Sequence, residues 1–108
     1  MFFHKELTEE KWQSLSFFEQ MANIGAEIGR VINWREKDKL LSTASLYRGL
    51  ELLDATIQDK KNHKSKLIEL CRVRELLADY FCFDNIYGSS DEKWNNYFYA
   101  FNYAARSK

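Results

Sequence analysis

Five charged side chains could form one polar network if the two helices that carry them turn toward each other. Arg48 and Glu51 lie three residues apart, and Arg72, Glu75 and Asp79 follow at spacings of three and four. Such spacings place side chains on one face of a helix. A network of this kind could hold a small ligand, form the polar centre of an enzyme, or orient two copies of the chain. Ordinary surface ion pairs are the alternative.

A basic segment between two predicted helices is the second candidate site. Five basic residues fall within the seven positions from 60 to 66: Lys60, Lys61, His63, Lys64 and Lys66. They could contact nucleic-acid phosphates. No aromatic residue is interleaved with these charges, although stacking on aromatic rings is the usual way to bind single strands. A solvated loop between helices is the alternative to an RNA-associated role.

Signatures of metal binding and nucleophilic catalysis are missing from the sequence. His4 and His63 do not stand in a Glu-x-x-His frame, which di-iron bundles require. Cys71 and Cys82 would lie about 16 Å apart on one helix, too far for a disulfide, and we expect them to be buried thiols. The sequence contains no phosphate-binding glycine loop and no Gly-x-Ser-x-Gly motif. It therefore predicts no metal, no cofactor and no catalytic residue.

Charge and hydropathy exclude two further classes of protein. The chain carries 16 basic and 16 acidic side chains, so it lacks the broad basic face of a non-specific nucleic-acid binder. No apolar run approaches the ~20 residues of a membrane span, and residues 1–6 do not read as a signal peptide. We therefore expect a cytoplasmic protein without a membrane partner.

Apolar residues recur at spacings of three and four, the period of amphipathic helices. They predict helices over about 17–34, 39–58, 66–81 and 90–105, after a short N-terminal lead-in. Ser16 with Glu19, and Ser89 with Glu92, fit capping boxes, and the absence of proline favours uninterrupted helices. We predict an all-α, antiparallel four-helix bundle of two hairpins, 17–34/39–58 and 66–81/90–105, as a single domain over 1–108.

Small residues in the first two helices predict how that hairpin packs. A glycine inside a helix costs ~1 kcal/mol relative to alanine, so Gly25, Gly29 and Gly49 need a compensating contact. A turn near Lys37 pairs Gly29 with Ser45 and Gly25 with Gly49, which lets the backbones approach closely. A ligand or a partner backbone lying against the glycines is the alternative.

The last two helices are expected to pair in the same way. A turn near Ile86 brings Val73 toward Phe98 and Tyr80 toward Trp94. The segment 79–88 between them is dense in aromatic residues. Its rings either plug one end of the bundle or form an exposed recognition surface.

Aromatic residues make up 16% of the chain, more rings than a small bundle can enclose. Those that we expect at the surface are Phe2, Phe3, Trp12, Trp34 and Tyr103. Exposed apolar patches usually mark interfaces, and twofold dimers are the commonest assemblies. The sequence thus predicts self-association, most simply as a homodimer.

Two segments carry a resemblance to known proteins. Residues 48–54 (RGLELLD) and 97–106 (YFYAFNYAAR) resemble an uncharacterised family of small microbial helical proteins, over a region from Leu15 to Arg106. That resemblance implies no activity. More loosely, the pattern is similar to HEPN-type bundles and to the four-helix proteins encoded in ribosomal RNA intervening sequences. HEPN ribonucleases carry an Arg shortly before a His, whereas the nearest Arg upstream of His63 is Arg48, so no catalytic residue is carried over.

From these observations we expect a non-enzymatic interaction module that self-associates and docks onto a larger protein partner. Two alternatives remain open at this point. One is an RNA-associated or defence-system bundle that uses the basic segment 60–66. The other is a small-ligand binding protein or enzyme built on Arg72, Glu75 and Asp79.

Overall fold

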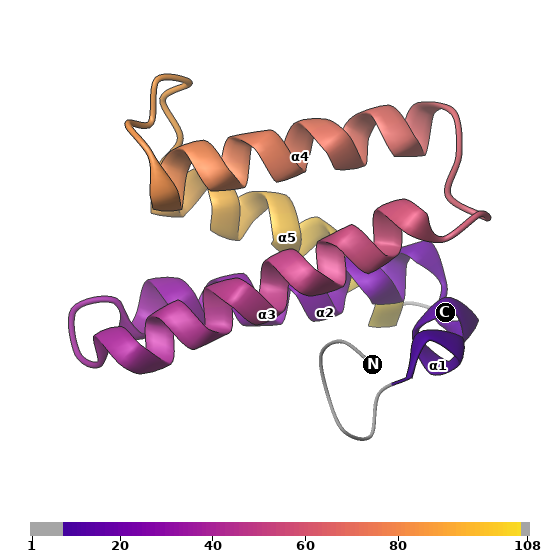
Figure 1. The fold of residues 1–108 in the computed structure, drawn as a ribbon, viewed down its shortest axis with the longest axis horizontal. Coiled ribbons are helices and arrows are strands. Elements are labelled where there is room, and N and C mark those ends of the chain that lie inside the picture. The colour runs from indigo at the N-terminus through magenta and orange to yellow at the C-terminus, as the bar shows by residue number, and fades with distance from the viewer. Residues whose placement is uncertain (1–7, 107–108) are drawn as a thin grey trace.

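The computed structural model describes residues 8–106, which are all-helical and contain no strand (Figure 1). Five helices follow one another in this range: α1 (Glu9–Ser14), α2 (Phe17–Trp34), α3 (Lys39–Gln58), α4 (Ser65–Cys82) and α5 (Asp91–Arg106). The predicted all-α class is confirmed. The four-helix bundle is not confirmed, because part of the expected lead-in forms the additional helix α1, which packs against α3.

Local hydrogen bonds set where the helices begin. At the start of α2, Ser16 Oγ accepts from the Glu19 amide at 3.1 Å, and Glu19 Oε1 accepts from the Ser16 amide at 2.9 Å. This is the predicted capping box. The box predicted for Ser89 and Glu92 is wrong by one residue. Ser90 caps α5 instead, its Oγ accepting from the Lys93 amide at 3.2 Å.

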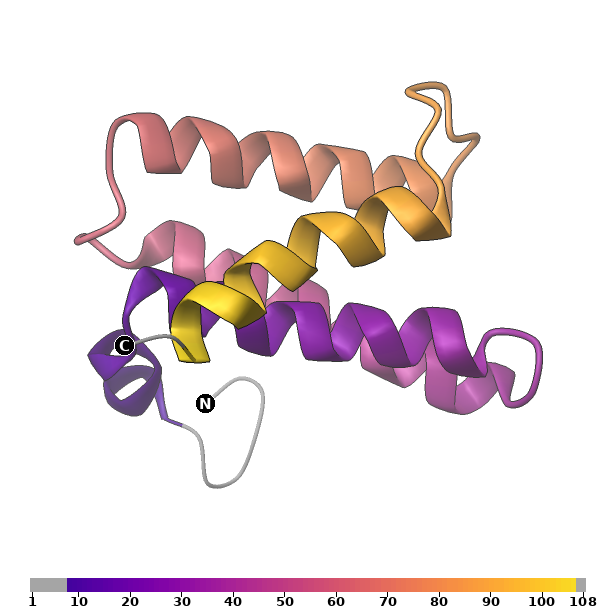
Figure 2. The same cartoon turned by 180° about the vertical axis from the view of Figure 1, so that it is seen from behind.

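Helices α2 and α3 run antiparallel and form the base on which the other helices lie (Figures 1 and 2). Ser42 Oγ on α3 donates to the Val31 carbonyl on α2 at 2.8 Å. The core between the helices contains aliphatic side chains from α2, α3 and α4 together with Trp12, Trp94 and Phe98. All four long elements thus contribute to one apolar interior.

Helix α5 packs along α2 rather than along α4, so the second predicted hairpin does not form a close-packed pair (Figure 2). A Cβ atom at Gly25 would lie 2.7 Å from Phe98 Cβ, which is closer than real contacts allow. The missing side chain therefore lets α5 rest on α2. Helix α4 instead lies beside α3, where Arg74 Nε and Asp54 Oδ1 form an ion pair at 2.8 Å.

The predicted pairing of small residues between α2 and α3 is wrong. Gly25 faces Phe98 of α5, and a Cβ at Gly49 would lie 3.2 Å from Ile28 Cδ1. Ser45 is fully buried, and its hydroxyl accepts from Arg48 at 3.3 Å. A Cβ at Gly29 would meet no atom within 4 Å in the described part of the chain. The register differs because α2 presents Gly25 to Phe98 of α5, whereas Ile28 of α2 packs against Gly49 of α3.

Several predictions of burial also need correction. Cys71 and Cys82 are exposed rather than buried, because α4 turns Leu70, Val73 and Leu77 inward. Trp12 is buried, not at the surface. Tyr103 is exposed as expected and Trp34 is half-buried. Phe2, Phe3 and His4 lie outside the described residues.

Alanine at Gly25 and at Gly29 is expected to have opposite effects on stability. Gly29→Ala raises the free energy of unfolding by roughly 0.5–1 kcal/mol, because it gains helix propensity without a clash. Gly25→Ala lowers it by about 1 kcal/mol, because overpacking against Phe98 outweighs that gain. Urea melts of dilute protein measure both values. Equal stabilisation by the two substitutions would contradict the close approach of α5 to α2.

Candidate functional site

The five residues of the predicted polar network do not meet at one place. Arg48 Nε lies 3.4 Å from Glu27 Oε1, and Glu51 lies at a separate hollow beside Glu9. Only the three members on α4 share a neighbourhood, around the loop 83–90. The spacing correctly placed them on one face of the helix, but that face does not point toward Arg48.

Those three residues surround the loop that leads from α4 to α5. The Asp79 carboxylate accepts from the backbone amides of Ile86 at 3.0 Å and Tyr87 at 3.1 Å. Glu75 Oε2 accepts from the Tyr87 hydroxyl at 3.1 Å, and this contact raises the pKa of Tyr87. Arg72, three residues before Glu75 on α4, lines a hollow together with Tyr87 of the loop. Asp79 and Glu75 therefore hold the loop in place.

All five side chains of the basic segment 60–66 are exposed, and two of them have intramolecular partners. Lys61 Nζ donates to the Asp59 carboxylate and to the Gln13 carbonyl. Lys66 Nζ lies 5.3 Å from the centre of the Phe17 ring. Lys60, His63 and Lys64 stay at the surface of the loop. The nucleic-acid alternative remains a prediction that no contact in the structure strengthens.

This loop is held by a buried cluster of polar side chains, here called the Gln20 cluster, which the sequence analysis missed. Gln20 Nε2 donates to the Trp12 carbonyl at 3.0 Å and to Asp59 Oδ2 at 2.9 Å, and Gln20 Oε1 accepts from Asn62 Nδ2 at 2.9 Å. Asn62 Nδ2 also donates to the Thr56 carbonyl at 3.1 Å. Buried polar groups are stable only when they are paired in this way. The cluster therefore joins α1, α2 and the end of α3.

Asp59 should make the stability of this cluster sensitive to acid. Burial opposes ionisation of its carboxyl group, but hydrogen bonds from Lys61 and Gln20 outweigh burial and lower the pKa of Asp59. A carboxylate with a depressed folded-state pKa contributes stability above its unfolded pKa and loses it as the pH falls. Asp59→Asn should therefore be less stable than the wild type at pH 7, and the difference should shrink below about pH 4.

Chemical melts at several pH values measure this difference. Asp84→Asn, at an exposed loop position, is the matched control and should follow the wild-type curve. An Asp59→Asn deficit that persists undiminished into acid would show that the Asp59 charge is not the source of the stability.

A second cluster of charges holds the start of α5. Arg35 Nη2 lies 2.8 Å and 2.6 Å from the two carboxylate oxygens of Asp91, and the Tyr80 hydroxyl donates to Asp91 Oδ1 at 2.6 Å. Although desolvation opposes ionisation, hydrogen bonds from Tyr80 and Arg35 lower the pKa of Asp91. Desolvation and the contact with Asp91 raise the pKa of Tyr80. Because these groups satisfy one another, we assign them a structural role.

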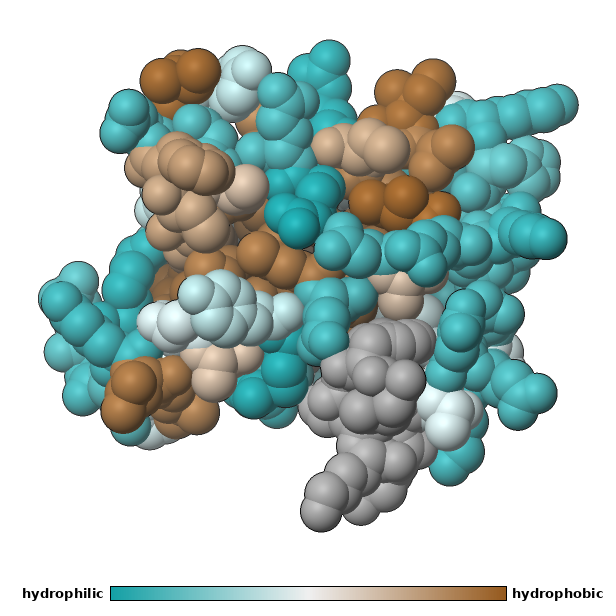
Figure 3. Space-filling model, viewed as in Figure 1, coloured by the Kyte–Doolittle hydropathy of each residue, from teal (hydrophilic) through white to brown (hydrophobic). Residues whose placement is uncertain are grey.

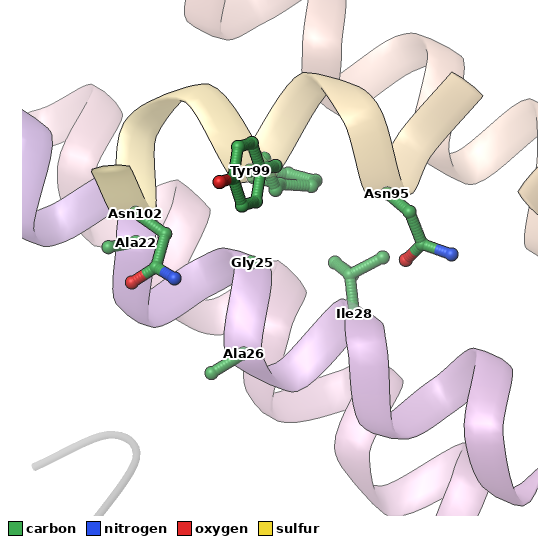
Figure 4. Close-up of a pocket in the computed structure, with 8 residues that line it drawn as sticks. Ala22, Gly25, Ala26, Ile28, Asn95, Tyr99 and Asn102 are labelled. Atoms are coloured by element: carbon green, nitrogen blue, oxygen red, sulfur yellow. The ribbon is translucent and has the colours of Figure 1, made fainter. Parts of the chain in front are cut away.

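The side chains that line the hollow between α2 and α5 are uncharged (Figure 4). The hollow has a volume of about 240 Å³, with Tyr99 and Asn102 on α5 above Ala22, Gly25 and Ala26 on α2. The exposed Arg30 lies one turn beyond Ala26 on α2. We define the α2–α5 face by these exposed or half-exposed residues: Phe18, Ala22, Ala26, Gly29, Asn95, Tyr99 and Asn102.

Exposed apolar side chains also occur elsewhere, most densely at Phe83, Ile86 and Tyr87 in the loop between α4 and α5. Ile68 on α4 is 71% exposed and shares its hollow with Arg72 and Glu75. Leu40 follows Lys39 at the start of α3. In Figure 3, which shows the side with α4 and α3 toward the viewer, apolar patches are broken up by hydrophilic ones. The α2–α5 face differs from these patches because α5 carries no charged residue from Trp94 to Ala105.

Comparisons with known proteins give no match from which a function of this face could be transferred. No family model, curated protein or solved structure matches the chain. Within residues 8–106, no helix is long and apolar enough to cross a membrane, and no group of three His, Cys, Asp or Glu side chains is placed to hold a metal ion. The resemblances drawn from residues 48–54 and 97–106 thus remain expectations, and the function has to be argued from the geometry.

Proposed function

We propose that this protein is a non-enzymatic interaction module that forms a homodimer through the α2–α5 face. The observation that carries the proposal is the absence of charge over the middle and end of α5, after Lys93 and before Arg106. The twelve residues from Trp94 to Ala105 contain no Asp, Glu, Lys or Arg, although a solvated helix face normally carries charges. Interface centres are depleted in charged residues and enriched in aromatic ones. The outward side of α5 has this composition.

The α2–α5 face also carries both halves of a self-complementary contact. Tyr99 is 66% exposed and lines the same hollow as the small residues Ala22 and Ala26 on α2 (Figure 4). Gly29 follows Ala26 by three positions on α2. In a twofold dimer the same patch meets itself, so a projecting group on one copy needs a recess on the other. Here Tyr99 of each copy seats against Ala26 and Gly29 of its partner.

Gly29 supports this arrangement because no contact among residues 8–106 requires a glycine there. The residue lies inside α2, and a side chain would have open space around it. Since glycine costs ~1 kcal/mol in a helix, a neighbour outside the chain accounts for it better than any contact inside. A ring or a backbone from the second copy is such a neighbour.

The dimensions of the face suit a small interface. Helix α2 has 18 residues and is therefore about 27 Å long. Two adjacent helices, each about 10 Å wide, present roughly 540 Å², at the low end of the range for specific complexes, so we expect a dimer that dissociates on dilution.

The proposal is tested by the molar mass in solution. The wild-type chain should sediment as a dimer at tens of micromolar concentration. Ala26→Arg should sediment as a monomer at the same concentration, because it places an unpaired charge at the centre of the interface. Tyr99→Ala should weaken the dimer by removing the projecting ring. Ala26 and Tyr99 are exposed, so circular dichroism should show both variants folded.

Leu40→Arg is the matched control, since Leu40 is 85% exposed and lies outside the α2–α5 face. It should leave the dimer intact. A wild-type monomer would refute self-association. A dimer that Ala26→Arg leaves intact and Leu40→Arg disrupts would place the interface at the start of α3 instead.

A further inference from the structure

A groove opens between α4 and α5 because α5 rests on α2. Its volume is about 440 Å³, within the range of ~300–1,000 Å³ typical of small-molecule sites. The walls come from α4, from residues 87–89 of the connecting loop, and from the first half of α5. None of its lining residues belongs to the α2–α5 face, so the groove is independent of the proposed dimer.

The interior of the groove is apolar and partly aromatic. Val73 and Trp94 are 4% and 5% exposed, and both line it together with Leu76 and Tyr97. The Trp94 indole N–H is buried and has no hydrogen-bond acceptor among the described residues. Unpaired buried donors are uncommon in native proteins. The groove therefore combines an apolar surface with an unsatisfied polar group in one of its lining side chains.

The charged side chains at the groove differ in whether they already have a partner within the protein. The Glu69 carboxylate accepts from the Tyr97 hydroxyl at 2.6 Å. Burial, together with this hydrogen bond, raises the pKa of Tyr97 far above its usual range and keeps the phenol a donor to Glu69. Lys93 Nζ donates to the Gly88 carbonyl at 3.1 Å, a bond that leaves its positive charge uncompensated.

Arg72 is the most available of these charges. Four other arginines precede the loop 83–90, and each of them pairs with a carboxylate. Arg30 and Arg48 pair with Glu27, Arg35 with Asp91, and Arg74 with Asp54. Arg72 forms no ion pair with residues 8–106, yet it lines the groove. A guanidinium with free donors is well suited to bind a carboxylate or sulfonate.

From this combination we propose that the α4–α5 groove binds a small amphipathic anion. The apolar or aromatic body of the ligand lies against Val73, Leu76 and Trp94, and its acidic head pairs with Arg72. Lys93 adds a second positive charge on the α5 side. Two cations, Arg72 and Lys93, line the groove, together with one carboxylate, Glu69, which already accepts from Tyr97. The groove therefore favours a monoanion over a neutral or cationic molecule of the same shape.

Two fluorescent probes of nearly equal shape test the proposal. One is 1-anilinonaphthalene-8-sulfonate, which carries a negative charge, and the other is N-phenyl-1-naphthylamine, its neutral counterpart. Titrated into the full chain, the sulfonate should bind saturably at one site per chain. Arg72→Gln should weaken sulfonate binding by about tenfold, which corresponds to the loss of one charge-assisted contact. Binding of the neutral probe should stay within about twofold.

Further variants locate the probe, because Arg72 also borders the neighbouring hollow that contains Ile68. Lys93→Gln alters only the groove between α4 and α5 and should weaken the sulfonate more than the neutral probe. Ile68→Ser alters only the neighbouring hollow and should have no effect. Arg106→Gln, at an exposed arginine outside both, controls for the loss of one positive charge.

The results separate the alternatives. Equal binding of the two probes, with no response to Arg72→Gln, would overturn the proposal and indicate non-specific adsorption to apolar surface. Loss of binding in Ile68→Ser, without loss in Lys93→Gln, would overturn it in favour of the outer hollow. Because Ala26 is remote from the groove, binding should be the same in Ala26→Arg, whatever the oligomeric state of that variant.

Discussion

The missing side chain at Gly25 determines how this molecule is arranged. Any larger residue there would collide with Phe98, so only glycine allows α5 to lie directly on α2. Two consequences follow from that contact. The side chains of α2 and α5 around their shared hollow form an uncharged surface, and α4 is left without α5 as a close neighbour. The proposed dimer interface and the proposed ligand groove are therefore two results of one close helix contact.

The helices could be predicted from sequence because their signals are local. Ser16 and Glu19 mark the start of α2, and the apolar period marks each long helix. Helix α1 is short and is held by tertiary contacts. Trp12 is buried against Thr56, whose Oγ1 accepts from the indole N–H at 3.0 Å, and the Trp12 carbonyl accepts from Gln20. The glycines correctly indicated a close approach, but a pattern within one helix does not say which neighbour approaches. For Gly25 that neighbour is Phe98, 73 positions further along the chain.

The polar groups show a similar division between what spacing can and cannot predict. Spacing put Arg72, Glu75 and Asp79 on one face of α4, but the direction of that face depends on how α4 sits beside α3. Gln20 carried a signal that could have been used, because it falls between Phe17 and Ile24 on the apolar side of α2. A polar residue in that position has to be buried with partners. Its partners Asp59 and Asn62 could not be inferred from spacing alone.

The outward position of the two cysteines has a consequence for chains under oxidising conditions. Cys71 and Cys82 lie on α4 and are open to solvent, whereas the proposed dimer uses α2 and α5. A disulfide between molecules would therefore link surfaces that dimerisation leaves uncovered. Cross-linking through α4 would therefore join dimers into larger assemblies. A reducing compartment would keep the assembly at the size that the α2–α5 face sets.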